Sequence, residues 1–306
     1  MADNELPGPM EGMLSGETMF LKQYGDRRTG TNILRALIVR NFRNVVVLMH
    51  VLGDKHSPPV ALESLRAEAA SAMDPAWEFV TRATWEAPAE TTFRESRNQR
   101  AYLRRIAAPL AAAVSAGRLG FLVSVKDPYS WAFSLTAWRG WLPYRYRWLP
   151  WLFRRAALRQ AVETRVRGAC RILNRNYAAW LELRHRFPER TSVVRIEDLW
   201  ANPRAVLDDL ARRHRLVYRG GDLILTERAA KAAPWDHSPI GERSISFTTR
   251  REAIQRRLAP VADAIRTAVT EEVDWDLFGT LGYAPRPDAP CGATADSSEP
   301  CGVSER

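Results

Sequence analysis

Four short apolar runs predict buried β-strands, and helical patterns separate them. The runs are nearly continuous in apolar and β-branched residues rather than alternating, which is typical of parallel strands covered on both faces. The predicted strands are residues 18–25, 44–53, 119–125 and 190–196. The predicted helices are residues 31–42, 60–72, 96–116, 156–186, 202–214 and 249–273. This alternation predicts an α/β fold, with one three-layer domain built around a central parallel sheet.

The two ends of the chain differ in composition from the part between them. Residues 1–16 are acidic and have no apolar core segment, which predicts a flexible lead-in rather than a secretory signal. Residues 285–306 are rich in Pro, Ser, Asp and Gly, which predicts a disordered tail. The α/β domain is therefore expected over residues 17–284. No run of about 18 apolar residues occurs, so no membrane span is predicted and a cytoplasmic location is expected.

The charge balance indicates an anionic partner. The 306 residues carry a formal net charge of +10, which favours nucleic acid, a phosphorylated cofactor, an acidic glycan or an anionic lipid. Charge alone does not choose among these anions. Cys170, Cys291 and Cys301 form neither a metal-ligand spacing nor a disulfide framework, and we expect no metal site.

A glycine-punctuated turn follows the first predicted strand and leads into a predicted helix. Such a P-loop-like turn places backbone N–H groups and the positive end of a helix dipole around an anion. Gly25 and Gly30 keep the spacing of the triphosphate-binding motif GxxxxGK followed by Ser or Thr. Thr31, however, stands at the lysine position and Asn32 at the position of the magnesium-binding hydroxyl. This departure argues against nucleoside-triphosphate chemistry and leaves a turn that can hold another phosphate.

The sequence of this turn, GDRRTGTN, resembles the 5′-phosphosulfate loop of sulfotransferases that use 3′-phosphoadenosine 5′-phosphosulfate (PAPS). That family has a basic residue before a Ser/Thr-Gly-Thr segment, and Arg28 stands at that position here. The resemblance covers roughly residues 18–284 and implies that PAPS is the co-substrate. It implies that the 5′-phosphosulfate is bound by Arg27, Arg28, Thr29, Gly30, Thr31 and Asn32.

A second element of the same family follows the third predicted strand. In the family an Arg, a Pro two residues on and a Ser eight residues on grip the 3′-phosphate. Lys126, Pro128 and Ser134 stand at those positions here. Lysine keeps the charge of arginine but lacks its bidentate fork. The resemblance implies that Lys126 and Ser134 bind the 3′-phosphate, and a further contact from residues 243–251 stays open.

Sulfuryl transfer is expected to have a loose transition state, so catalysis depends on positioning and on stabilising the leaving oxygens, with no metal required. Arg28 is the candidate for that stabilisation.

The loop after the second predicted strand contains His56-Ser57-Pro58, which resembles the His-x-Pro of cytosolic sulfotransferases, where the histidine is the base. The resemblance implies that His56 is the general base. Lys55 can contact the bridging or leaving oxygen, and Asp54 is the alternative base.

Segment 138–155 interleaves tryptophans with arginines. Three interpretations stay open: a lid over an acceptor pocket, a peripheral membrane contact, and a surface for acidic glycan or nucleic acid. Its position directly after the 3′-phosphate element favours the lid.

The favoured function is transfer of a sulfuryl group from PAPS to a hydroxyl or amine of an unidentified carbohydrate, lipid or small metabolite. One alternative is a P-loop nucleotide kinase or other phosphotransferase, against which the missing lysine argues. The other is a non-enzymatic binder of nucleic acid or membrane surfaces. No helix-turn-helix, zinc-finger or RNA-binding aromatic motif supports that last class, so nucleic acid is not expected as a partner. The acceptor and the oligomeric state stay open.

Overall fold

The computed structural model describes residues 17–48, 55–56, 58, 108–137, 151–223 and 258–286, with the backbone alone for 151–155. The chain divides into two compact units. Unit 1 lies within residues 1–126 and 175–242, and unit 2 within residues 127–174 and 243–306.

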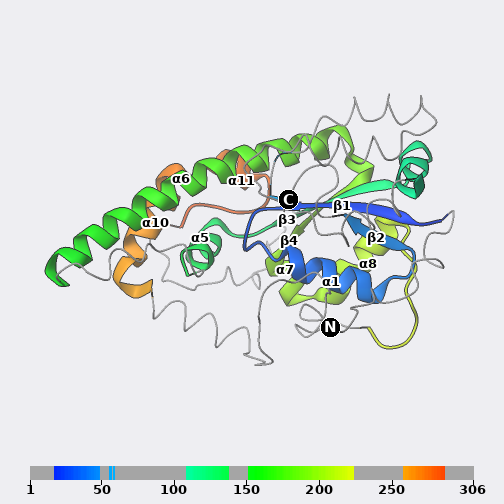
Figure 1. The fold of residues 1–306 in the computed structure, drawn as a ribbon, viewed down its shortest axis with the longest axis horizontal. Helices are drawn as coiled ribbons and strands as arrows, with labels where there is room; N and C mark the ends of the chain where they lie inside the picture. The colour runs from blue at the N-terminus through cyan, green and yellow to red at the C-terminus, as the bar shows by residue number, and fades with distance from the viewer. Residues whose placement is uncertain are drawn as a thin grey trace, which may run out of the picture. The chain divides into compact units, whose positions relative to one another are not determined.

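Unit 1 is built on a parallel β-sheet (Figure 1). Its four strands lie in the order β2-β1-β3-β4, and each neighbouring pair is parallel. The strands are β1 (Met19–Gly25), β2 (Val45–Leu48), β3 (Leu119–Val125) and β4 (Thr191–Arg195). Every residue of β3 is buried, as expected for a strand with neighbours on both edges and helices on both faces.

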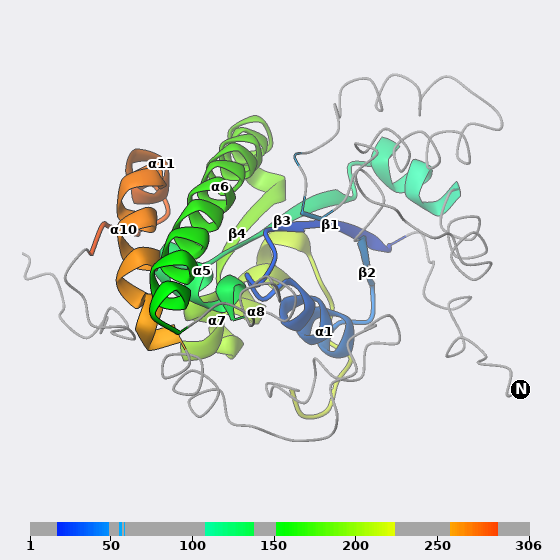
Figure 2. The ribbon, with the colours of Figure 1, turned by 60° about the vertical axis from the view of Figure 1, so that its left-hand side comes forward.

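Helices cover both faces of this sheet. On one face α1 (Thr31–Asn41), α7 (Ile196–Ala201) and α8 (Pro203–His214) share a hydrophobic core with Leu21 and Leu122 of the strands (Figures 1 and 2). On the other face lie residues 175–186 of α6 (Trp151–Arg186), where the Trp180 ring stacks on Tyr24 with 6.3 Å between centroids. A short 3₁₀ turn, Pro188–Arg190, leads into β4. The predicted α/β class, with three layers around a central parallel sheet, is confirmed.

Two helices begin as their sequences predict. The Asn202 side chain accepts a hydrogen bond from the N–H of Ala205 at 3.0 Å, and Pro203 is the first residue of α8. In unit 2 the Asp127 side chain accepts from the N–H of Ser130 at 2.8 Å, and a proline follows it in the same way. Both starts combine a capping side chain with a proline whose missing N–H costs nothing at that position.

Unit 2 is helical in its described residues. It contains α5 (Pro128–Thr136), the part of α6 up to residue 174, a 3₁₀ turn (Ala259–Val261), α10 (Ala262–Glu272) and α11 (Trp275–Gly279). The Tyr129 ring of α5 stacks on Trp275 with 5.5 Å between centroids. Its hydroxyl lies 2.9 Å from the hydroxyl of Thr270 and accepts the N–H of Arg286 at 3.0 Å. The Arg286 guanidinium pairs with Asp127 at the start of α5.

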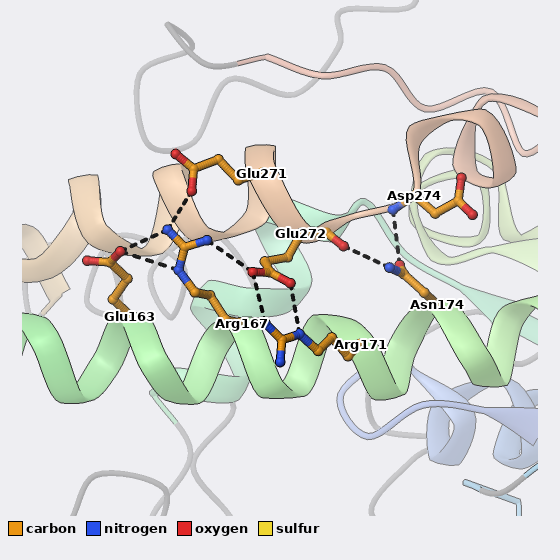
Figure 3. Close-up of polar contacts among 7 residues, drawn as sticks. All are labelled: Glu163, Arg167, Arg171, Asn174, Glu271, Glu272 and Asp274. Atoms are coloured by element: carbon orange, nitrogen blue, oxygen red, sulfur yellow. Dashed lines mark hydrogen bonds and ion pairs between the residues drawn. The ribbon is translucent and has the colours of Figure 1, made fainter.

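A charged cluster joins α6 to α10 in unit 2 (Figure 3). Arg167 pairs with Glu163 on its own helix and with Glu271 and Glu272 on α10. Arg171 pairs with Glu272 at 3.0 Å. Arg171 and Arg167 hold the pKa of Glu272 below its ordinary value. Exposed ion pairs contribute little individually, so this cluster fixes the register of α10 on α6 more than it adds stability.

Asn174 extends the same contact by two hydrogen bonds (Figure 3). Its Nδ2 donates to the carbonyl of Glu272 at 2.7 Å, and its Oδ1 accepts the N–H of Asp274 at 3.2 Å. The side chain therefore pairs with two backbone groups at the end of α10.

His214, the last residue of α8, is buried against the sheet of unit 1. Its Nε2 lies 2.9 Å from the hydroxyl of Ser192 on β4. Its ring fills the space beside Gly120 on β3, where an added Cβ would be 2.7 Å from Nδ1. Burial lowers the pKa of His214 to about 4, so the folded protein holds this ring neutral at pH 7.

The predicted elements agree closely with the observed ones. The ends of β1, α1, β3, β4 and α8 lie within one residue of the predicted ends. Helix α6 begins at Trp151 rather than at residue 156, because no proline or glycine in those five residues interrupts the helix. The predicted helix at 60–72, the end of the second predicted strand and the Trp/Arg segment up to residue 150 lie outside the described residues.

No helix among the described residues is long and apolar enough to cross a membrane. In the same residues, no group of three or more His, Cys, Asp and Glu side chains is arranged to hold a metal ion.

Candidate anion-binding site

The strand order creates a topological switch point between β1 and β3. The chain passes from β1 to β2 on one side of β1 and returns to β3 on its other side. In open parallel sheets, ligands bind in the crevice outside the carboxyl ends of the strands at such a point. Gly25, which ends β1, pairs with Ser124 of β3. The turn after Gly25 and the residue Lys126 therefore start at the same edge of the sheet.

Both glycines of the turn are required by close packing. A Cβ on Gly25 would lie 2.8 Å from Cγ2 of Thr31 and 2.9 Å from Cβ of Ser124. Gly30 has φ +76°, in the left-handed region, and a Cβ there would lie 2.1 Å from Cδ1 of Ile196. The glycine spacing seen in the sequence therefore reflects two positions where no side chain fits.

Hydrogen bonds inside the turn fix its shape. The Asp26 carbonyl accepts from the N–H of Thr29 at 3.3 Å and from its hydroxyl at 2.7 Å. The Asp26 carboxylate accepts the N–H of Arg27 at 2.5 Å. Arg28 has φ +72°, which is uncommon for a residue with a side chain. Thr29, a predicted phosphate ligand, is buried and its hydroxyl proton serves the turn itself, whereas Arg27 is exposed and Arg28 half-buried.

Helix α1 begins directly at the turn, with Gly30 as its N-cap. The Gly30 carbonyl accepts the N–H groups of Ile33 and Leu34, each at 3.0 Å, and the N–H groups of Thr31 and Asn32 have no acceptor within a helix that starts here. No side chain caps this end, and the first turn contains no acidic residue. Such a helix start presents N–H groups and a positive dipole end to an anion.

The turn after β2 is docked onto this helix start. The Lys55 carbonyl accepts the N–H of Gly25 at 2.9 Å, and its Nζ donates to Oδ1 of Asn32 at 2.8 Å. Nδ1 of His56 lies 2.6 Å from the Gly25 carbonyl. A carbonyl only accepts, so Nδ1 carries a proton, and in the neutral ring Nε2 carries the lone pair. The structure thus brings the predicted Lys55 and His56 to the glycine turn.

Lys126 follows the last residue of β3 and is half-buried. Tyr177 of α6 fixes this strand end, because its hydroxyl donates to the Ser124 carbonyl at 3.1 Å and also hydrogen-bonds the backbone of Lys126. Burial and the charge of Asp26 raise the pKa of Tyr177 well above its ordinary value, so the hydroxyl stays neutral. Ser134, the other predicted 3′-phosphate ligand, is half-buried on α5 and belongs to unit 2.

Asp26 is the acidic group of the glycine turn. Burial raises its pKa to about 6, although the N–H and charge of Arg27 and the side chain of Asn176 act to lower it. Carboxyls with pKa values raised this far are most common at functional sites, because the cost of burying such a group is retained where the group serves binding or catalysis.

Three buried polar residues that support the site were not predicted from the sequence. The Gln23 side chain donates to the Thr31 carbonyl at 2.8 Å, beneath the start of α1. Asn176 donates to the His56 carbonyl at 3.1 Å, and Tyr177 holds the end of β3. A glutamine inside an apolar strand was the available signal for the first, since buried polar side chains are nearly always paired. The alternative base, Asp54, lies outside the described residues.

Comparison with known proteins gives a structural neighbour. Neither a protein-family model nor a curated protein matches the sequence. Among solved structures, the chain is similar to the sulfotransferase domain of the olefin synthase of Synechococcus PCC 7002. The match has 16% sequence identity, covers 84% of this chain and 97% of that one, and has a TM-score of 0.29. A TM-score this low equates no individual residues, so the site described above stands on its own contacts.

Proposed function

We propose that this chain transfers a sulfuryl group from PAPS to a hydroxyl or amine of an acceptor molecule. The observation that carries the proposal is an uncapped helix start, preceded by a glycine turn, at the switch point between β1 and β3. This arrangement suits a nucleotide phosphate bound through backbone N–H groups. Position 31 has no lysine and position 32 has no hydroxyl side chain, which favours a sulfate donor over a magnesium-bound triphosphate.

The donor's two phosphate groups bind at neighbouring strand ends in this proposal. The N–H groups of Thr31 and Asn32 and the Arg28 side chain surround the 5′-phosphosulfate. Lys126, after β3, binds the 3′-phosphate in this proposal. Lys55, bonded to Asn32, adds a positive charge beside the helix start.

The reaction is an in-line displacement at sulfur. The acceptor oxygen or nitrogen forms a bond to sulfur while the bond from sulfur to the 5′-phosphate oxygen breaks, and 3′-phosphoadenosine 5′-phosphate (PAP) leaves. The acceptor proton passes to Nε2 of His56, the ring nitrogen with the lone pair when Nδ1–H is bonded to Gly25. Arg28 and Lys55 stabilise the charge that develops on the leaving oxygens. Asp54 stays the alternative base.

Calorimetric titration with PAP tests the donor site without knowledge of the acceptor. We expect wild type to bind PAP without a metal, and to bind AMP and magnesium-ATP much more weakly. Arg28→Ala and Lys126→Ala should each weaken PAP binding by roughly 10- to 100-fold, because each removes a charge-assisted phosphate contact.

Arg212→Ala is the matched control, since it removes one positive charge from an exposed ion pair on α8. It should leave the affinity for PAP within about twofold of wild type, because exposed charges outside a site act weakly. Absence of PAP binding, or tighter binding of magnesium-ATP, would overturn the proposed function and favour the phosphotransferase.

A further inference from the structure

One buried amide side chain contacts both halves of the anion-binding site. Asn176 lies on α6 and has no exposed surface. Its Nδ2 donates to the carbonyl of His56 at 3.1 Å, and its side chain also hydrogen-bonds the carboxylate of Asp26. Asp26 opens the glycine turn, whereas His56 belongs to the turn that follows β2. Asn176 therefore connects two loops that are distant in the sequence.

The chemistry of its partners fixes the orientation of this amide. A carbonyl and a carboxylate both accept hydrogen bonds, so the NH₂ group of Asn176 makes both contacts. Its Oδ1 is buried and has no hydrogen-bond partner among the described residues. A buried amide oxygen without a partner lowers stability, and an apolar residue at this position would avoid that cost. An asparagine here is thus poorly explained by packing and well explained by the two hydrogen bonds that its NH₂ group donates.

The adjacent residue on α6 acts on the other flank of the site. Tyr177 holds the Ser124 carbonyl and the backbone of Lys126, at the end of β3. Loss of the Asn176 amide therefore leaves the Lys126 side of the site anchored, and its effect should concentrate on His56 and the glycine turn.

We infer that Asn176 is a positioning residue for the sulfuryl transfer proposed above, on which this inference rests. By holding the backbone of His56 against Asp26, it keeps Nδ1–H bonded to the Gly25 carbonyl. It thereby determines that Nε2 is the nitrogen that receives the acceptor proton. The reaction needs one ring tautomer, and the contact from α6 selects it.

Nitrogen-15 NMR of the histidine rings tests this inference on the whole chain, with His56→Ala to assign the His56 signals. In wild type we expect His56 to show the Nδ1–H form. In Asn176→Ala its ring signals should move toward a mixture of the two tautomers. The Kd for PAP should also rise, by up to about tenfold, because the glycine turn loses the hydrogen bond that holds Asp26 to α6.

Asn174→Ala is the matched control on the same helix. Asn174 also makes two hydrogen bonds, to Glu272 and Asp274, but both lie in unit 2. It should lower the unfolding midpoint to a similar degree and leave both the His56 signals and PAP binding unchanged. If Asn176→Ala does not fold, Asn176→Ser keeps one donor and should give the same ring change in smaller measure.

The outcomes separate the two proposals. A lowered unfolding midpoint with unchanged His56 ring signals in the Asn176 variant overturns the positioning role, because packing alone then explains the residue. Failure of wild type to bind PAP overturns the proposed function instead. In that case a tautomer change in Asn176→Ala still establishes that this side chain controls His56.

Discussion

Replacement of Gly30 by alanine is expected to lower both the stability of unit 1 and its affinity for PAP. A Cβ at this position would lie 2.1 Å from Cδ1 and 2.8 Å from Cγ1 of Ile196, and the backbone has φ +76°. The left-handed conformation costs a residue with a side chain about 1 kcal/mol. Overpacking against Ile196 adds about 1–3 kcal/mol. The free energy of unfolding should therefore fall by about 2–4 kcal/mol.

Gly221 separates the two contributions. Its φ is +77°, nearly the same as that of Gly30, but nothing lies within 4 Å of an added Cβ. Gly221→Ala should therefore cost only the conformational part, about 1 kcal/mol. Ile196→Ala removes both of the atoms nearest to the new methyl group. Gly30→Ala should then cost less in the Ile196→Ala background than in wild type.

These costs are measured by denaturant unfolding of four variants: Gly30→Ala, Gly221→Ala, Ile196→Ala, and Gly30→Ala combined with Ile196→Ala. Calorimetry measures PAP binding. Gly30→Ala should weaken PAP binding at least about tenfold, since the start of α1 must shift to accept the methyl group. Equal costs for Gly30→Ala and Gly221→Ala would refute the reasoning, as would the absence of relief by Ile196→Ala.

Two buried ionisable groups give opposite pH dependences, each measured as the free energy of unfolding against pH. The pKa of His214 is lowered to about 4, so its contribution is complete above the unfolded value of 6.5 and is lost as the pH falls from 6.5 to 4. His214→Gln should remove that loss of about 3 kcal/mol, and an unchanged profile would contradict it. The pKa of Asp26 is raised to about 6 from 3.8, so stability is lost as the pH rises through that range. Asp26→Asn should raise stability at pH 7 by up to about 3 kcal/mol, and a loss of stability there would show that the ionised carboxylate is needed for the turn.

Much of the fold was predictable because hydrophobic pattern and local chemistry agree. The third predicted strand, residues 119–125, is buried at every position in the structure, so its apolar run carried a clear signal. Helix α8 was bounded at its start by Asn202 and Pro203, whose capping geometry the structure shows. The start of α6 was placed too late, because the Trp/Arg composition before residue 156 obscured a helix that nothing interrupts.

The site was predictable only where its residues are adjacent in sequence. The turn from Gly25 to Asn32 and the pair Lys55 and His56 could be picked out because short motifs mark them. The contact between these two segments could not be predicted, since it depends on the strand order and on the hydrogen bond from Lys55 to Asn32. Asn176 belongs to neither of these short motifs. Its role comes from tertiary contacts across 120 positions of sequence, which no local pattern encodes.

The glycine turn gathers several features that each lower stability. Arg28 holds a left-handed conformation, Asp26 is a buried carboxyl with a raised pKa, and α1 starts without a side-chain cap. Lys55 places a positive charge beside the positive end of that helix. Helix α8 of the same unit, by contrast, starts with a capping side chain. Several such departures gathered at one turn are typical of a functional site, where strain and unbalanced charge are retained for binding. An anion at the start of α1 would pair with the uncapped N–H groups and with Lys55 at once, which offsets two of these costs and explains why they occur together.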